Sequence, residues 1–483
     1  MTPTEAVDRA TQIYDDACAA LRAALEAFID AGATPDLELR ATGAFAYPEL
    51  RIVYDPDGPP PPISRAFAKL SEPGVYAGTI TQPVFFRNYL ISQLEMLARD
   101  YPVAFDVTKS RSEIPYPYVL DQAAGVDAEA LPPAEFARWF PTPDLSQIGD
   151  EIADGDPWGA DGIDEGGVKP LALFDGPRVD FSLQRLKHYT GTPFQHVQRY
   201  ILFTNYHRYV DAFVDWAVDR LKTPGHYTQL SAPGGVVVDA NTKGAAKKIA
   251  DGPWRRHQMP AYHLMAENGA GISLVNIGVG PSNAKTITDH LAVLRPEVWI
   301  MVGHCGGLRQ SQRIGDYVLA HAYLRDDHAL AAVLPPDIPV PPIAEVQVAL
   351  QEAAEAVTGE ARDELKKRLR TGTVVTTDDR NWELRYSDSA KRFNQSRAVA
   401  IDMESATIAA NGYRLRVPYG VLLCVSDKPL HGELKLPGSA NRFYERAIGE
   451  HIRIGIETLE RLSRGDAALH SRKLRAFDEP PFR

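Results

Sequence analysis

Three carboxylates stand at the ends of two apolar runs, where they could do acid–base chemistry. Asp402 and Glu404 follow the run AVAI, and Asp427 follows the run YGVLLCVS. A carboxylic acid can protonate a leaving group, a carboxylate can stabilise developing positive charge, and burial can separate the pKa values of two such groups. The spacing alone favours a structural role for Asp427, because an Asp after a buried strand is more often a cap or a turn former than a catalyst. A Glu in a first helical turn is stabilised by the helix dipole wherever it occurs.

Two further strand ends carry glycine-rich turns, NIGVGPSNAKT at 276–286 and MVGHCGG at 301–307. Glycines such as Gly280 let a ligand approach the backbone, and Pro281 suits the first turn of a helix whose free N–H groups can face an anion. The signatures of a P-loop and of a dinucleotide cofactor are both missing from the sequence. We expect His304, in the second turn, to contact a substrate and not to act as a catalyst.

The elements that must position these residues alternate between strands and helices. Short β-rich runs are GGVVVDAN, ISLVNIGVG, EVWIMVG, GTVVTT, AVAID and YGVLLCVSD, and helical patterns lie between several of them, including 282–294 and 404–414. This alternation predicts an α/β fold with a mixed, mostly parallel sheet flanked by helices. Ligands gather at the carboxyl ends of such strands, so the four turns should converge there.

The N-terminal part has a different pattern, which predicts an α+β domain over 1–178. Residues 2–32 read as one helix with Thr4 as its cap and Gly32 at its end; 37–56 read as two strands, followed by a helix at 85–101.

The stretch from about 121 to 178 is rich in Pro, Gly and Asp and is a candidate linker, or else an ordered loop lying on the catalytic part. Residues 188–221 read as mostly helix. The catalytic domain is expected over 179–483, ending in an irregular tail.

Bulk properties exclude several classes of protein. The chain has 483 residues, a net charge of −11 and three cysteines. Such a length predicts at least two domains, and the acidic charge argues against a nucleic-acid partner. No apolar stretch approaches the about twenty residues that span a bilayer, and the N-terminus lacks the pattern of a secretory signal. The widely spaced cysteines fit a reducing compartment, so we expect a cytoplasmic protein without a membrane partner and without a metal site.

The order and wording of the motifs resemble a known superfamily. Over about 233–460 the sequence resembles the nucleoside phosphorylases and nucleosidases, which cleave the glycosidic bond of purine nucleosides. MVGHCGGL with IGDYVL resembles their central signature, AIDMESATIA their ribose-binding motif, and VPYGVLLCVSD the strand with their catalytic aspartate. Over almost the whole length, including TGTVVTTDDRNWELRY and CVSDKPLHGELKLPG, the sequence resembles the AMP nucleosidase family.

The resemblance implies hydrolysis of AMP to adenine and ribose 5-phosphate without a cofactor. It implies that Asp427 protonates N7 of the purine, that Glu404 binds the ribose hydroxyls and that Met403 lies under the sugar. Asp402 is left between a supporting hydrogen bond and a cap. The alternatives are a purine nucleoside phosphorylase and a non-catalytic nucleotide-sensing protein.

Phosphorylases of the superfamily hold free phosphate with two arginines, whose places the sequence fills with Ala245 and Met301, and His304 replaces a serine. Water is therefore the expected nucleophile. The group that activates it stays open between Asp239 and Glu404.

The 5′-phosphate needs a cationic or hydroxyl-rich pocket. The preferred candidates are Thr190, Thr192 and Arg199, with Lys243 in a second loop; further candidates are His207, Arg208, Lys247 and Lys248. Arg380 or Trp382 could cover the adenine, although a core role fits Trp382 equally well. By resemblance, ATP should activate the enzyme, phosphate should inhibit it, the N-terminal domain should be regulatory, and the chain should form a homohexamer.

Overall fold

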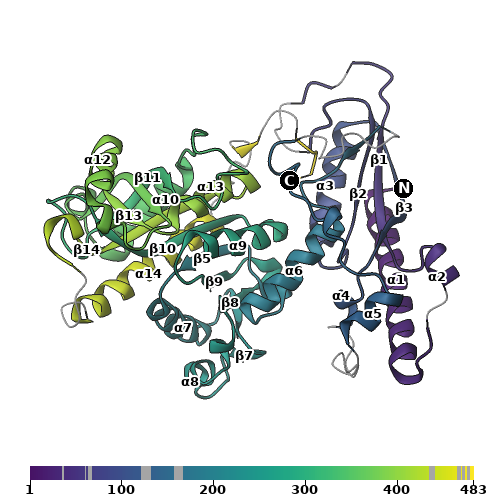
Figure 1. Cartoon of the computed structure of the whole chain (residues 1–483), viewed down its shortest axis with the longest axis horizontal. Helices are drawn as coiled ribbons and strands as arrows, with labels where there is room; N and C mark the ends of the chain where they lie inside the picture. The colour runs from purple at the N-terminus through teal and green to yellow at the C-terminus, as the bar shows by residue number, and fades with distance from the viewer. Residues whose placement is uncertain are drawn as a thin grey trace. The chain divides into compact units, whose positions relative to one another are not determined.

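The chain is divided into two units, shown in the computed structural model in Figure 1. Unit 1 comprises residues 1–184 with 475–483, and unit 2 comprises 185–474. The structure describes residues 1–34, 37–59, 61–63, 68–120, 132–156, 167–434, 441–464, 469, 474–475 and 479–482. The division falls inside helix α6 (Gly176–Thr190), close to the predicted boundary at 178, and the last residues lie with unit 1.

Unit 1 begins with the long helix α1 (Pro3–Ala31), as the apolar periodicity predicts. Its cap is Thr2 and not Thr4, because the Thr2 hydroxyl accepts from the Glu5 N–H while the Glu5 carboxylate accepts from the Thr2 N–H. Gly32 ends the helix in the left-handed conformation, as expected.

A four-stranded sheet in the order β3-β1-β2-β4 supports this helix. Its elements are β1 (Ala46–Tyr54), β2 (Gly74–Thr79), β3 (Val103–Glu113) and β4 (Val168–Pro170), with helices α2 (Leu37–Ala41), α3 (Arg87–Asp100), α4 (Pro117–Leu120) and α5 (Pro133–Trp139). The prediction of two strands over 37–56 was half wrong, since the first run is the short helix α2. The helix predicted at 85–101 is α3.

The described parts of the predicted linker are ordered in unit 1. Phe136 and Phe140 pack in its apolar core with residues of α1, and β4 pairs with β2. Residues 121–131 and 157–166 lie outside the described ranges. A Pro- and Gly-rich composition therefore marks irregular backbone here, which still buries aromatic side chains.

Unit 2 is built on a ten-stranded sheet in the order β13-β12-β11-β14-β10-β5-β9-β8-β6-β7. The strands are β5 (Tyr200–Thr204), β6 (Tyr227–Ala232), β7 (Val236–Asp239), β8 (Ala261–Ala266), β9 (Ile272–Asn276), β10 (Val298–Gly307), β11 (Tyr317–Asp326), β12 (Leu369–Thr377), β13 (Ala400–Asp402) and β14 (Tyr419–Asp427). The central strands β14, β10, β5 and β9 are parallel, and β13 also pairs with the end of β10. The mixed sheet confirms the predicted fold class.

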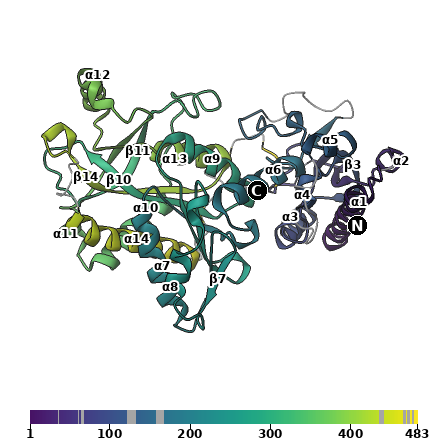
Figure 2. The same ribbon diagram turned by 60° about the horizontal axis from the view of Figure 1, so that its bottom comes forward.

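Helices cover both faces of this sheet, with α9 and α13 on one face and α7, α10 and α14 on the other (Figure 2). The helices of unit 2 are α7 (His207–Leu221), α8 (Ala245–Ala250), α9 (Pro281–Leu291), α10 (Ala344–Thr358), α11 (Arg362–Leu365), α12 (Tyr386–Ser396), α13 (Ser405–Leu415) and α14 (Asn441–Arg464). Among the described residues, no helix combines the length and apolar character needed to span a bilayer.

The prediction of helix over most of 188–221 was wrong at its centre. Residues 200–204 form β5, a strand between β10 and β9 that is buried on both faces. A five-residue apolar run of this kind has no periodicity that separates strand from helix. The error matters, because β5 directs a loop into the candidate site.

Candidate active site

The polar strand ends converge as the topology requires. Strands β5, β9, β10 and β14 run parallel, so their carboxyl ends share one edge of the sheet. Gly306 of β10 pairs with Asp427 of β14 on one side and with Ile401 of β13 on the other. At about 4.8 Å between neighbouring strands, the backbones at Asp427 and Ile401 lie roughly 10 Å apart across Gly306.

Glu404 is buried where this edge meets the start of α13. Its Oε2 accepts from Asn205 Nδ2 over 2.9 Å, and its Oε1 accepts from the Gly280 N–H over 2.7 Å. Burial raises the pKa of Glu404 above the ordinary glutamate range, and the negative charge of Asp402 raises it further. The two donors act in the opposite direction, because they bind the ionised form.

Asp402 supports the turn before α13, whose N-cap residue is Glu404. The Asp402 carboxylate accepts from the Ser405 N–H over 2.9 Å, from the Ser405 hydroxyl, and from the Thr376 hydroxyl over 2.6 Å. Burial also raises the pKa of Asp402. These contacts are supporting hydrogen bonds, one of the two roles left open by the sequence, and they fix the turn that carries Glu404.

Asp427 ends β14 in a half-buried position. Its Oδ1 accepts from the Ser426 hydroxyl over 2.5 Å. The following residue, Lys428, is buried and forms an ion pair with Glu433 over 2.5 Å, which closes a tight loop after the strand. Asp427 and Glu404 are therefore presented from two elements that flank β10.

Three other predicted contacts lie at the same edge. Gly280 precedes α9 with a φ of 117°, a conformation that favours glycine, and donates to Glu404 as described. His304 is buried beside the rings of Tyr206 and Tyr209, at centroid distances of 5.2 and 5.4 Å. Met403, which stands between Asp402 and Glu404 in the sequence, is half-buried.

Thr190 and Thr192 are buried in a hydrogen-bond network and are not presented to this edge. The Thr190 hydroxyl donates to the Leu186 carbonyl over 2.7 Å, and the Thr192 hydroxyl contacts His263 Nε2 over 2.8 Å. Burial lowers the pKa of His263 to about 3, so the ring is neutral. These groups hold α6 and β8 together, and the preference for them as phosphate donors has no support from their positions.

Arg199 lies at the amino end of β5, on the side of the sheet where the parallel strands begin. It precedes β5, whose carboxyl end and not its amino end faces the site, and its guanidinium forms an ion pair with Glu297. The sequence places Arg199 near several polar residues, but strand direction separates it from them.

Lys243 follows β7, the edge strand at the far end of the sheet from β13, and is exposed. Ala245 begins α8 in the same loop. Four strand spacings separate β7 from β5, about 19 Å. The loop that carries Lys243 and Ala245 therefore lies away from the loop after β5, which contains Asn205.

Arg380 and Trp382 follow β12. Trp382 is buried in an apolar cluster with Phe393, Leu308 and Ile401, and its ring meets that of Phe393 edge-on at 5.2 Å. Arg380 is exposed. The core role for Trp382, left open by the sequence, is the one that its packing supports.

Asn205 is a residue of this site that the sequence patterns did not indicate. It directly follows the run ILFT, so a prediction of that run as a strand would have placed a polar residue at a strand end.

A cavity beside this loop contains two of the further phosphate candidates, His207 and Lys247. It measures about 430 Å³ and is lined by His207, Val210, Asp211, Val214, Asp215, Ala246, Lys247, Ile249, Ala250, Trp254, Arg255 and Tyr262.

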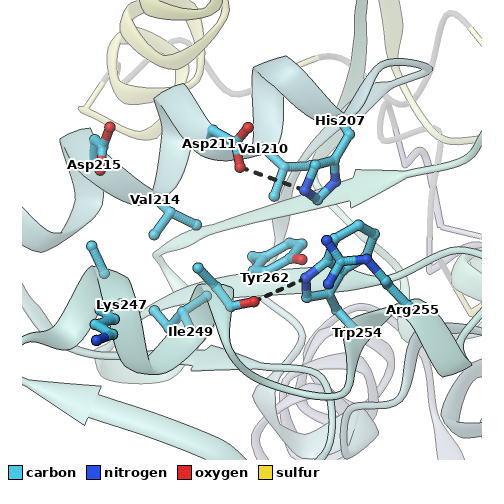
Figure 3. A pocket seen from close by; sticks show the side chains of 12 residues that line it. His207, Val210, Asp211, Val214, Asp215, Lys247, Ile249, Trp254, Arg255 and Tyr262 are labelled. Carbon is cyan, nitrogen blue, oxygen red and sulfur yellow. Dashed lines mark hydrogen bonds and ion pairs between the residues drawn. The ribbon is translucent and has the colours of Figure 1, made fainter.

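Within this cavity, His207, Trp254 and Arg255 lie together at one end, and Asp215 and Lys247 lie at the other (Figure 3). The His207 and Trp254 rings stack with centroids 3.9 Å apart, and the Arg255 guanidinium lies 4.2 Å from the Trp254 ring. Burial lowers the pKa of His207. The cavity therefore has an aromatic, cationic end at the start of α7.

Two family models match the chain. Residues 5–162 match the bacterial AMP nucleoside phosphorylase N-terminus, and residues 235–460 match the phosphorylase superfamily.

Among curated relatives, the chain is similar to the AMP nucleosidase of Escherichia coli (strain K12), with 58% identity over 484 residues, which covers 100% of this chain and 99% of the relative. A guanosine phosphorylase of Halorubrum lacusprofundi is 24% identical over 189 residues, covering 38% of this chain and 74% of the relative. Among solved structures, an AMP nucleosidase from Bacteroides thetaiotaomicron is 29% identical, with a TM-score of 0.42 over 58% of this chain and 96% of that one.

Proposed function

Because this chain belongs to the AMP nucleosidase family, we propose that it hydrolyses the N-glycosidic bond of AMP and releases adenine and ribose 5-phosphate. The position of Glu404 is the structural observation that supports this proposal most directly. It is a buried carboxylate whose two oxygens are each held by one donor, at the edge where Asp427 also stands.

The chemistry of the bond requires two carboxyl groups in different states. Breaking C1′–N9 places negative charge on the base and positive charge on the sugar. Asp427 in its acid form would protonate N7, and ionised Glu404 would bind the ribose hydroxyls and stabilise the oxocarbenium-like sugar. The separation of roughly 10 Å between their strands, across Gly306, leaves room for a nucleoside between the two side chains.

Water is the proposed nucleophile. Met301, at the place of a phosphate-binding arginine, is fully buried in β10 and paired with Phe203 of β5, so its side chain supplies no charge to the site. Of the two groups proposed to activate the water, Asp239 ends β7 and accepts from Thr242 and the Asn241 N–H within its own turn. Glu404 remains as the group to orient the water.

The cavity at the start of α7 is our candidate for the 5′-phosphate subsite. His207 lies two residues after Asn205, at most about 7 Å along the chain, and Asn205 contacts the proposed sugar carboxylate. Arg255 and the dipole at the start of α7 favour an anion at that end. The Asp211 carboxylate, 3.5 Å from His207 Nε2, lies at the same end and opposes an anion, and Asp215 lies at the other end.

One assay separates the candidate reactions. Release of ribose 5-phosphate and adenine from AMP without added phosphate supports hydrolysis; dependence on phosphate supports a phosphorylase, and release of ribose from adenosine supports an unphosphorylated-nucleoside hydrolase. No release of adenine at all would support the nucleotide-sensing alternative.

The acid role of Asp427 has its own variant. Asp427→Asn keeps the size of the side chain and removes the transferable proton, so turnover should fall by roughly 100- to 10,000-fold while AMP still binds. Calorimetric titration with AMP measures the binding. A turnover rate close to that of the unchanged chain would contradict this assignment.

We also propose that unit 1 is regulatory, with ATP as activator and phosphate as inhibitor, and that the enzyme is a cytoplasmic homohexamer. Unit 1 has a cavity of about 290 Å³ whose lining includes Arg40, Arg111 and Tyr118, and Arg40 pairs with Glu113. Arg111→Ala should weaken the response of AMP hydrolysis to phosphate without lowering the basal rate. An unchanged response would place the effector elsewhere.

A further inference from the structure

Asn205 contacts Glu404 across the sheet. The two residues are 199 positions apart in the chain, and they meet because β5 and β13 both pair with β10. The bond of 2.9 Å joins the side-chain amide to Oε2, while the Gly280 N–H binds Oε1. The donors thus come from two different strand-end loops, and each holds one oxygen.

The Asn205 amide is oriented with Nδ2 and not Oδ1 toward Glu404, so that it donates to the carboxylate and favours its ionised form. Oδ1 is buried and has no hydrogen-bond partner among the described residues.

Gly303 of β10 makes room for this amide. A Cβ at position 303 would lie 2.6 Å from Met301 Cε, the end of a flexible side chain, and 3.1 Å from Asn205 Oδ1, and both distances are closer than ordinary van der Waals contact. The glycine in MVGHCGG therefore has a packing reason that involves Met301 as well as Asn205.

We propose that Asn205 is a positioning residue that holds Glu404 ionised and turned toward the sugar, and that Gly303 is a glycine in order to seat it. The inference rests on the proposed function, since it assumes that Glu404 binds the ribose. A carboxylate has about four acceptor positions, and the two donors occupy one on each oxygen. The acceptor positions that remain are available to the hydroxyls of a ribose.

The electrostatic surroundings make the contribution of Asn205 measurable. Burial and the charge of Asp402 on β13 favour the protonated form of Glu404; the Asn205 amide and the Gly280 and Met403 N–H groups favour the ionised form. A backbone donor survives any side-chain substitution. Asn205 is therefore the member of this group that can be removed, and its removal should make Glu404 harder to ionise.

The test is the pH profile of kcat/KM for adenine release from AMP. Asn205→Ala should move the acid limb to higher pH by roughly one unit, the size expected for one hydrogen bond to a charged group. Asn205→Asp, which keeps the shape but sets a second carboxylate beside Glu404, should move it further, and Gly303→Ala should move it in the same direction.

Asn411→Ala is the matched control. Asn411 is a buried amide on α13 that donates to Asp289 over 2.7 Å, away from Glu404. Its loss should lower the unfolding temperature and leave the acid limb in place.

A second readout does not need activity. The infrared band of the Glu404 carboxyl, identified by its absence in Glu404→Gln, should titrate at higher pH in Asn205→Ala than in the unchanged chain. If the limb and the band both stay in place in the folded Asn205 variants, the inference is overturned. If the unchanged chain releases no adenine from AMP, the proposed function fails, while the band still decides whether Asn205 favours ionised Glu404.

Discussion

Replacing Glu404 by glutamine tests whether the charge of this buried carboxylate is needed. Glutamine has the same shape but one acceptor oxygen in place of two. Either Asn205 Nδ2 or the Gly280 N–H would then face an NH₂ group, so one charge-assisted hydrogen bond of about 1.5–3 kcal/mol is lost. The negative charge that should stabilise the sugar in the transition state is lost with it.

We expect kcat for AMP hydrolysis to fall roughly 100- to 1,000-fold, the range for removing one preorganised electrostatic contact. KM should change much less, because the hydroxyls of bound AMP carry no charge before the bond breaks. Steady-state adenine release measures both constants. A kcat near that of the unchanged chain would refute the electrostatic role.

The difference in stability between Glu404→Gln and the unchanged chain should depend on pH. The pKa of Glu404 is raised in the folded chain by burial and by Asp402, so the folded chain binds this proton more tightly than the unfolded chain does. That contribution is complete below the ordinary glutamate pKa and is lost as the pH rises through the folded-state pKa. Glutamine cannot ionise, so the unfolding temperature of Glu404→Gln relative to the unchanged chain should rise over this window. A constant difference would contradict the burial argument.

Two further substitutions separate a role in binding from a role in structure. Arg255→Ala should raise KM for AMP by roughly tenfold or more, because the phosphate loses a charged partner worth about 1.5–3 kcal/mol. Any cleavage of adenosine, which has no phosphate, should stay unchanged, and a constant KM for AMP would remove Arg255 from the phosphate subsite. Thr192→Val should lower the free energy of unfolding by about 1–3 kcal/mol, because it leaves His263 Nε2 without its buried partner, and should not change KM for AMP; a large increase in KM with unchanged stability would restore Thr192 as a phosphate donor.

The candidate site was partly predictable from the sequence because its parts end strands. Asp427, Gly280 and His304 lie in or shortly after apolar runs that form parallel strands, and parallel strands bring such positions to one edge whatever lies between them in the chain. Glu404 also follows an apolar run, but its strand β13 reaches this edge by pairing antiparallel with the end of β10. The turn before α13 is also local, since Asp402 accepts from the N–H of Ser405, three positions away.

The positions of Arg199 and Lys243 relative to the candidate site depend on strand direction and order. Arg199 and Asn205 lie on either side of the same short strand, yet only Asn205 is at the carboxyl end. Lys243 follows a strand as the other candidates do, but β7 is the edge of the sheet. Neither fact can be read from an apolar run of four or five residues, which has no periodicity to identify it or to order it.

By itself, the sequence determined the α/β class, the strand ends that carry the carboxylates and the family of the chain. These follow from local patterns and from the identity of neighbouring residues. Only the tertiary structure decided which donors hold Glu404, because Asn205 and Gly280 are 199 and 124 positions away from it. Burial, which raises the pKa of Glu404, is likewise a product of packing from both faces of the sheet.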